Sequence, residues 1–152
     1  DASGAIQTTP YLNATVRAGD VPGEHATAVG GIIRSTHDFF KGHAYGCTLL
    51  SAAAGPALTQ TTVVPAMEWA IGQGAMIVNS SFGYDTKGEF TWIDVYYDYV
   101  SVNSRVLNVV SAGNFGGGTG YVTSPGVGYN VLTVGAIDGA FTPSWGDDIM
   151  AP

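Results

Sequence analysis

The sequence predicts an α/β protein in which a parallel β-sheet is sandwiched between helices. Short apolar runs of strand length alternate along the chain with segments whose apolar residues repeat at helical spacing. The apolar runs are continuous, which is typical of strands buried on both faces of a parallel sheet. A chain of 152 residues with 45% hydrophobic content can bury one core, so we expect a single domain over residues 1–152.

The first predicted helix covers His25–Ser35, and an apolar strand over residues 47–52 follows it. Gly30 and Gly31 lie inside this helix, where a glycine costs about 1 kcal/mol relative to alanine. We interpret both glycines as positions where the helix approaches the sheet closely. His25, Val29, Ile32 and Ile33 lie at helical spacing on one face of this helix.

The second predicted helix covers Val63–Gln73. Thr62 is placed to cap its first turn, where Pro65 is also tolerated. Gly72 and Gly74 mark its end, because glycine commonly terminates helices.

The third predicted helix covers Phe90–Asn103 and has an amphipathic pattern. Three apolar strands surround it in the sequence, over residues 75–78, 106–111 and 131–135. The bulky residues on the predicted buried face of the helix are Ile93, Tyr96, Tyr97 and Val100.

The composition excludes several classes of partner. The formal net charge is −7, and the five Lys and Arg residues are scattered, so no basic surface is available for nucleic acid or an anionic membrane. No apolar run reaches the roughly 20 residues that a membrane span requires. Cys47 is the single cysteine, which excludes an internal disulfide and a cysteine-rich zinc cluster.

The glycine-rich segments do not have the spacing of a nucleotide site. Residues 113–120 lack the G-x-G-x-x-G order that opens a helix, and the segment 83–88 is followed by Glu89 where a phosphate-binding loop needs lysine. A nucleotide-binding α/β domain is therefore the least favoured interpretation of this fold class.

Polar residues follow two of the predicted strands, at Asn79–Gly83 and Ser111–Asn114. Open parallel sheets bind ligands at the carboxyl ends of their strands, so these residues are candidates for a site. His25, His37 and His43 contain no helical i, i+4 pair and have no neighbouring cysteine, so we expect no zinc site. From its position alone, His25 has a structural role as the alternative to a catalytic one. The corresponding alternative for Asn114 is that it is a turn residue.

Five segments resemble the subtilase family of serine peptidases and occur in the family's order. The first, His25–Ile33, resembles the H-G-T-H-V-A-G-I-I signature, whose first histidine is the general base. Lys41–Leu50 is similar to G-V-A-P-x-A-x-L, Trp69–Gly83 to W-A-x-x-x-G-A-x-V-I-N-x-S-x-G, Ser111–Asn114 to A-A-G-N, and Val131–Asp138 to V-I-T-V-G-A-x-D.

The resemblance implies an incomplete subtilisin-like three-layer fold and a serine-type endopeptidase with a Ser/His/Asp triad. His25 would accept the proton of the serine hydroxyl and return it to the leaving amine. Asn114 would donate its side-chain amide to the developing oxyanion.

The resemblance also implies a site for a peptide or protein substrate. Ser81, Phe82 and Gly83 would form an edge along which an extended substrate adds as a strand. Ala112 and Gly113 would form a wall of the pocket for the residue before the cut.

The chain departs from the family in two motifs, the histidine signature and the motif that contains the acid. Ala26 and Ala28 replace the second and fourth residues of H-G-T-H. The family's acid lies in D-T-G or D-S-G, whereas the segment Asp1–Gly4 is one residue longer. Asp1 is thus a candidate for the orienting carboxylate, and the alternatives are that the acid precedes this sequence or that Ala2 occupies its place.

The family's nucleophile lies in G-T-S-x-A, which occurs nowhere in this sequence. Ser144 comes closest, but the turn-forming residues 145–148 follow it, and residues 148–152 are similar to the D-V-M-A-P that precedes the serine. We expect the chain to be a central fragment, inactive alone, with the serine beyond it. The alternative is a catalytically degenerate subtilase-like domain that binds peptides or has a structural role.

The sequence gives no certain cofactor. The resemblance makes structural calcium possible, but Asp147 and Asp148 are interpreted as a solvated turn and no metal ligand is assigned. The low charge, the acidity and the resemblance together favour secretion.

Overall fold

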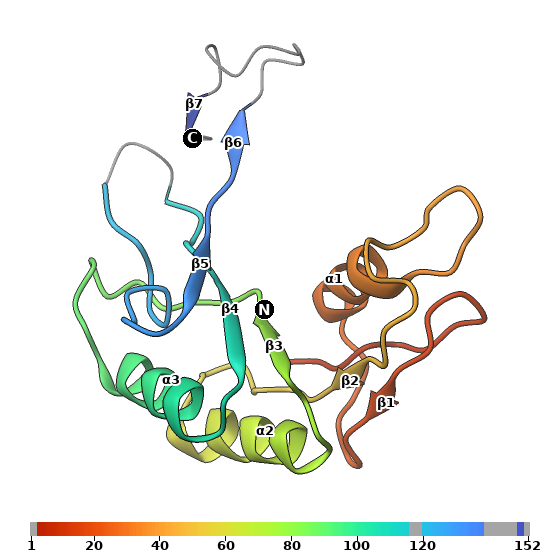
Figure 1. Cartoon of the computed structure of the whole chain (residues 1–152), viewed down its shortest axis with the longest axis horizontal. Helices are drawn as coiled ribbons and strands as arrows, with labels where there is room; N and C mark the ends of the chain where they lie inside the picture. Colours follow the sequence, from red (N-terminus) through yellow and green to blue (C-terminus); the bar gives the residue numbers. More distant parts are fainter. Residues whose placement is uncertain (1–2, 116–119, 139–148, 151–152) are drawn as a thin grey trace. The chain divides into compact units, whose positions relative to one another are not determined.

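The computed structural model describes residues 3–115, 120–138 and 149–150 and has the predicted α/β class (Figure 1). The chain divides into two compact units, Asp1–Ala75 and Met76–Pro152. Asp1, Ser144, Asp147 and Asp148 lie outside the described residues.

The first unit contains a small parallel pair of strands, β1 (Thr15–Val16) and β2 (Leu50–Ser51). Strand β1 was not predicted, since two residues are too short to show a periodic pattern. Strand β2 is shorter than the predicted strand over residues 47–52. The Ser51 hydroxyl accepts a hydrogen bond from the Ile6 amide at 2.9 Å, which ties the start of the chain to β2.

Helix α1 (Glu24–Arg34) begins one residue before the predicted start and also ends one residue earlier. Gly30 is buried, and a Cβ there would lie 2.6 Å from Cδ1 of Ile6. A Cβ on Gly31 would have no atom within 4 Å. Gly30 therefore allows a close approach, but to Ile6 and not to a strand, and the interpretation is wrong for Gly31.

Helix α2 (Gln60–Gly72) begins one turn earlier than predicted, so Thr62 is not its cap. Thr59 is the N-cap residue, and its amide donates to the Thr62 hydroxyl at 3.0 Å. Threonine can be the N-cap residue itself, or it can be the third helical residue whose hydroxyl accepts a bond from the N-cap amide, as Thr62 is here. The sequence pattern does not distinguish these two positions, so the predicted start of the helix was wrong. Pro65 consequently lies beyond the first turn.

The end of α2 agrees with the prediction from its glycines. Gly74 has φ +87°, a conformation that side chains disfavour. The Gly74 amide donates to the Ile71 carbonyl at 2.9 Å, and the Ala75 amide donates to the Ala70 carbonyl at 3.0 Å. These two bonds form a Schellman motif, which satisfies carbonyls at the helix end.

The second unit is built on a parallel sheet of β3 (Ile77–Ser80), β4 (Leu107–Ser111) and β5 (Leu132–Val134), with β4 in the middle. Ser80 lies opposite Val110 in the register. The carboxyl ends of these strands therefore share one edge of the sheet. A separate antiparallel pair, β6 (Ile137–Asp138) and β7 (Ile149–Met150), was too short to predict.

Helix α3 (Trp92–Asn103) packs on this sheet through the face that the sequence predicted. Ile93, Tyr97 and Val100 are buried, while Tyr96 is half-buried. The hydroxyl groups of Tyr97 and Ser80 are 2.8 Å apart, which joins α3 to β3.

The opposite face of the sheet is also apolar. Ile77 lies opposite Leu107, and Leu132 lies opposite Val109 on the same face. Ile77, Leu107 and Leu132 are all exposed in the described structure. Their apolar character explains why the strand sequences predicted burial on both faces.

Candidate active site

The two segments that we assign to substrate binding lie at the carboxyl edge of the sheet. Ser81, Phe82 and Gly83 follow β3, and Ala112 and Gly113 follow β4. Because β3 and β4 are parallel neighbours, the structure brings these predicted residues together. This is the edge at which open parallel sheets bind their ligands.

A third segment enters between these two strand ends. The Ala112 amide donates to the Val134 carbonyl on β5, and the Ala112 carbonyl accepts from the Thr123 amide at 3.0 Å. Thr123 also lies against Gly83, which follows β3, and against Gly113, which follows β4. The Tyr84 amide in turn donates to the Ser124 carbonyl at 2.8 Å, so residues 123–124 bridge the two segments.

The side chain of Thr123 lies against a glycine on each side. A Cβ on Gly83 would overlap the Thr123 hydroxyl oxygen, and a Cβ on Gly113 would lie 2.6 Å from the Thr123 methyl carbon. Gly113 also has φ +103°, which other residues rarely adopt. Both glycines predicted at this site are thus required by the close approach of Thr123.

Two residues of the predicted substrate edge, Phe82 and Gly83, have unpaired backbone groups among the described residues. Within the part of the chain that the structure describes, the amide and carbonyl groups of Phe82 and Gly83 make no hydrogen bond. Phe82 is half-buried, where an unpaired backbone group is costly. An added peptide strand would satisfy these groups.

Asn114 directly follows Gly113 and is exposed at the same strand end. The Gly113 amide donates to the Ser111 hydroxyl at 3.0 Å, which stabilises the turn before Asn114. The predicted oxyanion donor thus follows the predicted pocket wall along one strand end.

A buried carboxylate supports the bridging segment. Asp94 is fully buried, and its Oδ2 accepts bonds from the Ser124 hydroxyl at 2.6 Å and from the Thr91 amide at 2.8 Å. Asp94 is on α3, so the helix fixes the segment that contains Thr123. Tyr84, whose amide donates to the Ser124 carbonyl, has a phenol whose pKa is raised by burial.

The sequence analysis did not identify Thr123, Ser124 or Asp94 as residues of this site. Thr91 and Asp94 have the spacing of a capping box, which would have placed Asp94 near the start of a helix. No sequence pattern connects that helix start to Ser124, because their contact depends on the tertiary fold.

His25 lies in the first turn of α1, in the unit Asp1–Ala75, and is exposed. The chain before the helix is held by the start of the sequence: the Gly23 amide donates to the Ala5 carbonyl at 2.8 Å. A Cβ on Gly23 would lie 2.8 Å from Cα of Gly4, so this approach also requires glycine. Gly4, near the start of the chain, thus packs against Gly23, which lies two residues before His25 in the sequence.

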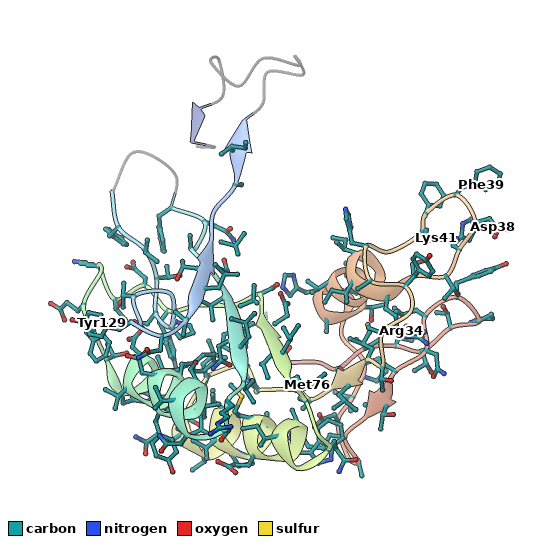
Figure 2. All side chains as sticks on the ribbon, in the orientation of Figure 1. Arg34, Asp38, Phe39, Lys41, Met76 and Tyr129 are labelled. Atoms are coloured by element: carbon teal, nitrogen blue, oxygen red, sulfur yellow. The ribbon has the colours of Figure 1, made fainter. Side chains whose placement is uncertain are left out.

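The other two histidines occur in the loop between α1 and β2. The Nδ1 atom of His37 accepts hydrogen bonds from the amides of Phe39 and Phe40 at 3.2 and 3.3 Å. Figure 2 shows Asp38 and Phe39 at the tip of this loop. His43 is exposed, and its amide donates to the Ile32 carbonyl at 3.0 Å.

The described residues contain no cluster of three or more His, Cys, Asp or Glu side chains that could hold a metal ion. Among the same residues, no helix is long and apolar enough to cross a membrane.

Comparison with known proteins agrees with this arrangement of helices, strands and strand ends. Residues 13–144 match the Peptidase_S8 profile, which describes the subtilase family. The chain belongs to the subtilase family, whose members are serine peptidases.

A solved structure described as that of the prenylagaramide maturation protease PagA is similar to this chain, with a TM-score of 0.69 and 27% sequence identity. The similarity covers 93% of this chain and 54% of that protein, so the chain spans about half its length. A search of curated protein sequences found no match.

Proposed function

We propose that this chain is part of a serine endopeptidase that hydrolyses peptide bonds through a Ser/His/Asp triad. His25 is the general base, Asn114 is the oxyanion donor, and Asp1 is the candidate for the orienting carboxylate. The nucleophilic serine is supplied from outside these 152 residues, because no serine here has the required motif.

The observation that carries this proposal is the edge formed by Ser81, Phe82 and Gly83. The unpaired backbone groups of Phe82 and Gly83 can bond to an extended peptide, as in β-strand addition. Main-chain bonds hold the peptide irrespective of its sequence, while side-chain pockets select among sequences. Ala112 and Gly113 form one wall beside this edge.

The proposed chemistry has two stages. The serine oxygen bonds to the substrate carbonyl carbon while His25 takes the hydroxyl proton, and His25 then protonates the amine as the carbon–nitrogen bond breaks. His25 next deprotonates a water molecule that attacks the acyl carbon, and it returns this proton to the serine oxygen as the bond between that oxygen and the acyl carbon breaks and the acid leaves. Asn114 stabilises the negative oxygen in each stage.

The substitutions Ala26 and Ala28 favour a second candidate function, a degenerate domain that binds peptides without cleaving them. Both alanines directly flank Thr27 in the helix that contains His25. Thr27 itself is fixed, since its hydroxyl donates to the Gly23 carbonyl at 2.8 Å and accepts from the Gln7 amide at 2.9 Å.

A fluorophosphonate probe distinguishes the two candidates, because it reacts with a serine that an adjacent base has activated. We expect stoichiometric labelling of one serine in the full-length protein that contains this chain, and loss of labelling in His25→Ala. We expect no labelling of the 152-residue chain. A folded full-length protein that is not labelled would favour the peptide-binding candidate.

A further inference from the structure

The loop between α1 and β2 contains a tight turn that is closed by a histidine side chain. The Nδ1 atom of His37 accepts hydrogen bonds from the amides of Phe39 and Phe40, at 3.2 and 3.3 Å. Two N–H donors therefore converge on one ring nitrogen. In a neutral imidazole only one nitrogen is an acceptor, so the ring proton of His37 lies on Nε2.

The base of this turn is fixed by backbone bonds. Thr36 and Lys41 form an antiparallel bridge, and the Thr36 amide donates to the Tyr11 carbonyl at 2.8 Å. Within the part of the chain that the structure describes, the amides of Phe39 and Phe40 have no hydrogen-bond partner other than Nδ1. The imidazole thus closes the tip of the turn, while the backbone closes its base.

The His37 ring also contacts two aromatic rings. Its centroid lies 4.8 Å from that of Tyr11 in a T-shaped arrangement and 5.3 Å from that of Phe40. The side chains of Phe39 and Phe40 are 88% and 78% exposed, so the closed turn presents both of them to solvent. The position of the His37 ring therefore determines how two exposed aromatic side chains are held.

Few charged groups near His37 depend on its protonation state. Tyr11 is the titratable residue that packs on the ring from the segment before α1, and Asp38 and Lys41 are exposed neighbours in the loop itself. Among the described residues, the imidazole forms no ion pair with a carboxylate. Arg34, in the last turn of α1, donates from Nε to a backbone carbonyl at 2.7 Å. The two amide bonds are thus the interactions that protonation of the ring would change.

We propose that His37 is a pH-sensitive switch, whose neutral ring closes the turn at Phe39 and Phe40 and whose protonation opens it. A proton taken up from solvent binds Nδ1 and converts this atom from an acceptor into a donor. Nδ1 then faces two N–H donors, so both hydrogen bonds are lost and the tip of the turn is released. Histidine ordinarily changes charge between about pH 5 and pH 8. The closed turn is therefore favoured at the upper end of this range and lost as the pH falls.

The test follows the turn by NMR in the full-length protein, with ¹⁵N-labelled phenylalanine and histidine. At about pH 8 the ring ¹⁵N shifts of His37 should show an unprotonated Nδ1. As the pH is lowered to about 5, the amide signals of Phe39 and Phe40 should shift with the same midpoint as the His37 ring. The protection of each amide against hydrogen exchange should fall by about 2- to 10-fold, as expected for the loss of one hydrogen bond.

Two variants separate this switch from other effects of pH. His37→Asn keeps a side-chain acceptor that does not titrate, so the amide signals of Phe39 and Phe40 should become independent of pH. His43→Asn is the matched control, because His43 is an exposed histidine of the same loop whose Nδ1 lies 3.5 Å from the Ile32 carbonyl. This control should keep the wild-type response.

The inference is overturned if neutral His37 has its proton on Nδ1, or if folded His37→Asn keeps the wild-type pH response. The position of the ring proton in the wild type decides the question even if the asparagine variant does not fold.

Discussion

At the scale of single residues, glycine marks the positions where this chain packs most closely. Gly83 and Gly113 contact Thr123, and Gly4 contacts Gly23 before the helix that contains His25. A side chain at any of these positions would displace a neighbouring segment. The high glycine content is thus partly explained by close packing inside each of the two units.

Asn114→Ala in the full-length protein is expected to lower kcat far more than it raises KM. The asparagine is proposed to bond to the substrate oxygen only after that oxygen gains charge, so its contribution belongs to the transition state. In subtilisins, loss of one such donor lowers kcat by about 10²- to 10³-fold. Steady-state kinetics on folded protein provides the measurement.

The control for this variant is Asp85→Ala, in the exposed turn after the substrate edge. The Asp85 carboxylate accepts a bond from the Lys87 amide at 3.2 Å and stabilises only that turn. We expect an effect on substrate preference at most. A near-normal kcat in Asn114→Ala would contradict the assignment of Asn114 as the oxyanion donor and would leave it as a turn residue.

The residues of the site could be predicted to different extents. His25 was placed correctly in the first turn of a helix because a nine-residue motif surrounds it. The strand-end positions of Phe82 and Gly113 could be predicted because each is the second residue after an apolar strand, and their role in substrate binding stays a prediction. Thr123 and Asp94 were missed because their importance depends on contacts between segments that are distant in the sequence.

At the scale of elements, the helices were predicted more accurately than the strands. Helix α3 has its predicted C-terminal end and buried face because its apolar spacing repeats over three turns. The strands β1, β6 and β7 have two residues each, too few for a period to be visible. The start of α2 was misplaced because Thr59 and Thr62 share the capping interaction.

Gly30→Ala and Gly31→Ala form a matched pair in α1. Alanine is better than glycine inside a helix by about 1 kcal/mol, so Gly31→Ala should raise the unfolding free energy by up to about that amount. Gly30→Ala places its Cβ against Ile6, and overpacking costs about 1–3 kcal/mol. Chemical denaturation of the two variants measures the difference, and equal stabilisation would contradict the close packing at Gly30.

The contact between α3 and β3 should depend on pH through Tyr97. Burial raises the pKa of the Tyr97 phenol, and its hydrogen bond with Ser80 partly opposes this rise. A pKa raised in the folded state favours folding fully below the unfolded value of about 10, and this contribution is lost as the pH rises toward the folded pKa.

We therefore expect the melting temperature to fall more steeply above about pH 10 in the wild type than in Tyr97→Phe, since the unfolded tyrosine ionises near that pH. The phenylalanine variant lacks the ionisable group but also loses the bond to Ser80, so it should be less stable at neutral pH. Identical slopes from pH 8 to pH 11 in the two proteins would show that Tyr97 does not contribute.

At the scale of the whole molecule, the sequence was sufficient for the fold class and the family. The α/β class follows from alternating periodicities, and the family follows from five motifs in order, which the match over residues 13–144 confirms. The division into the units Asp1–Ala75 and Met76–Pro152 was not predicted. The composition does not change at residue 75. The Schellman turn at the end of α2 is followed closely by β3, so no linker marks the boundary between the units.

His25 belongs to the unit Asp1–Ala75, and the predicted substrate edge belongs to the unit Met76–Pro152. The central claim is that His25 acts as a general base, and it is tested most directly by peptide hydrolysis with the full-length protein. His43→Ala is the matched control, since His43 is an exposed histidine of the same unit.

In subtilisins, loss of the catalytic histidine lowers kcat by about 10⁶-fold. We expect a loss of that order in His25→Ala, measured on protein whose melting temperature matches the wild type, and near-normal kcat in His43→Ala. Comparable turnover in the His25→Ala and His43→Ala variants would contradict the assignment of His25 as the base.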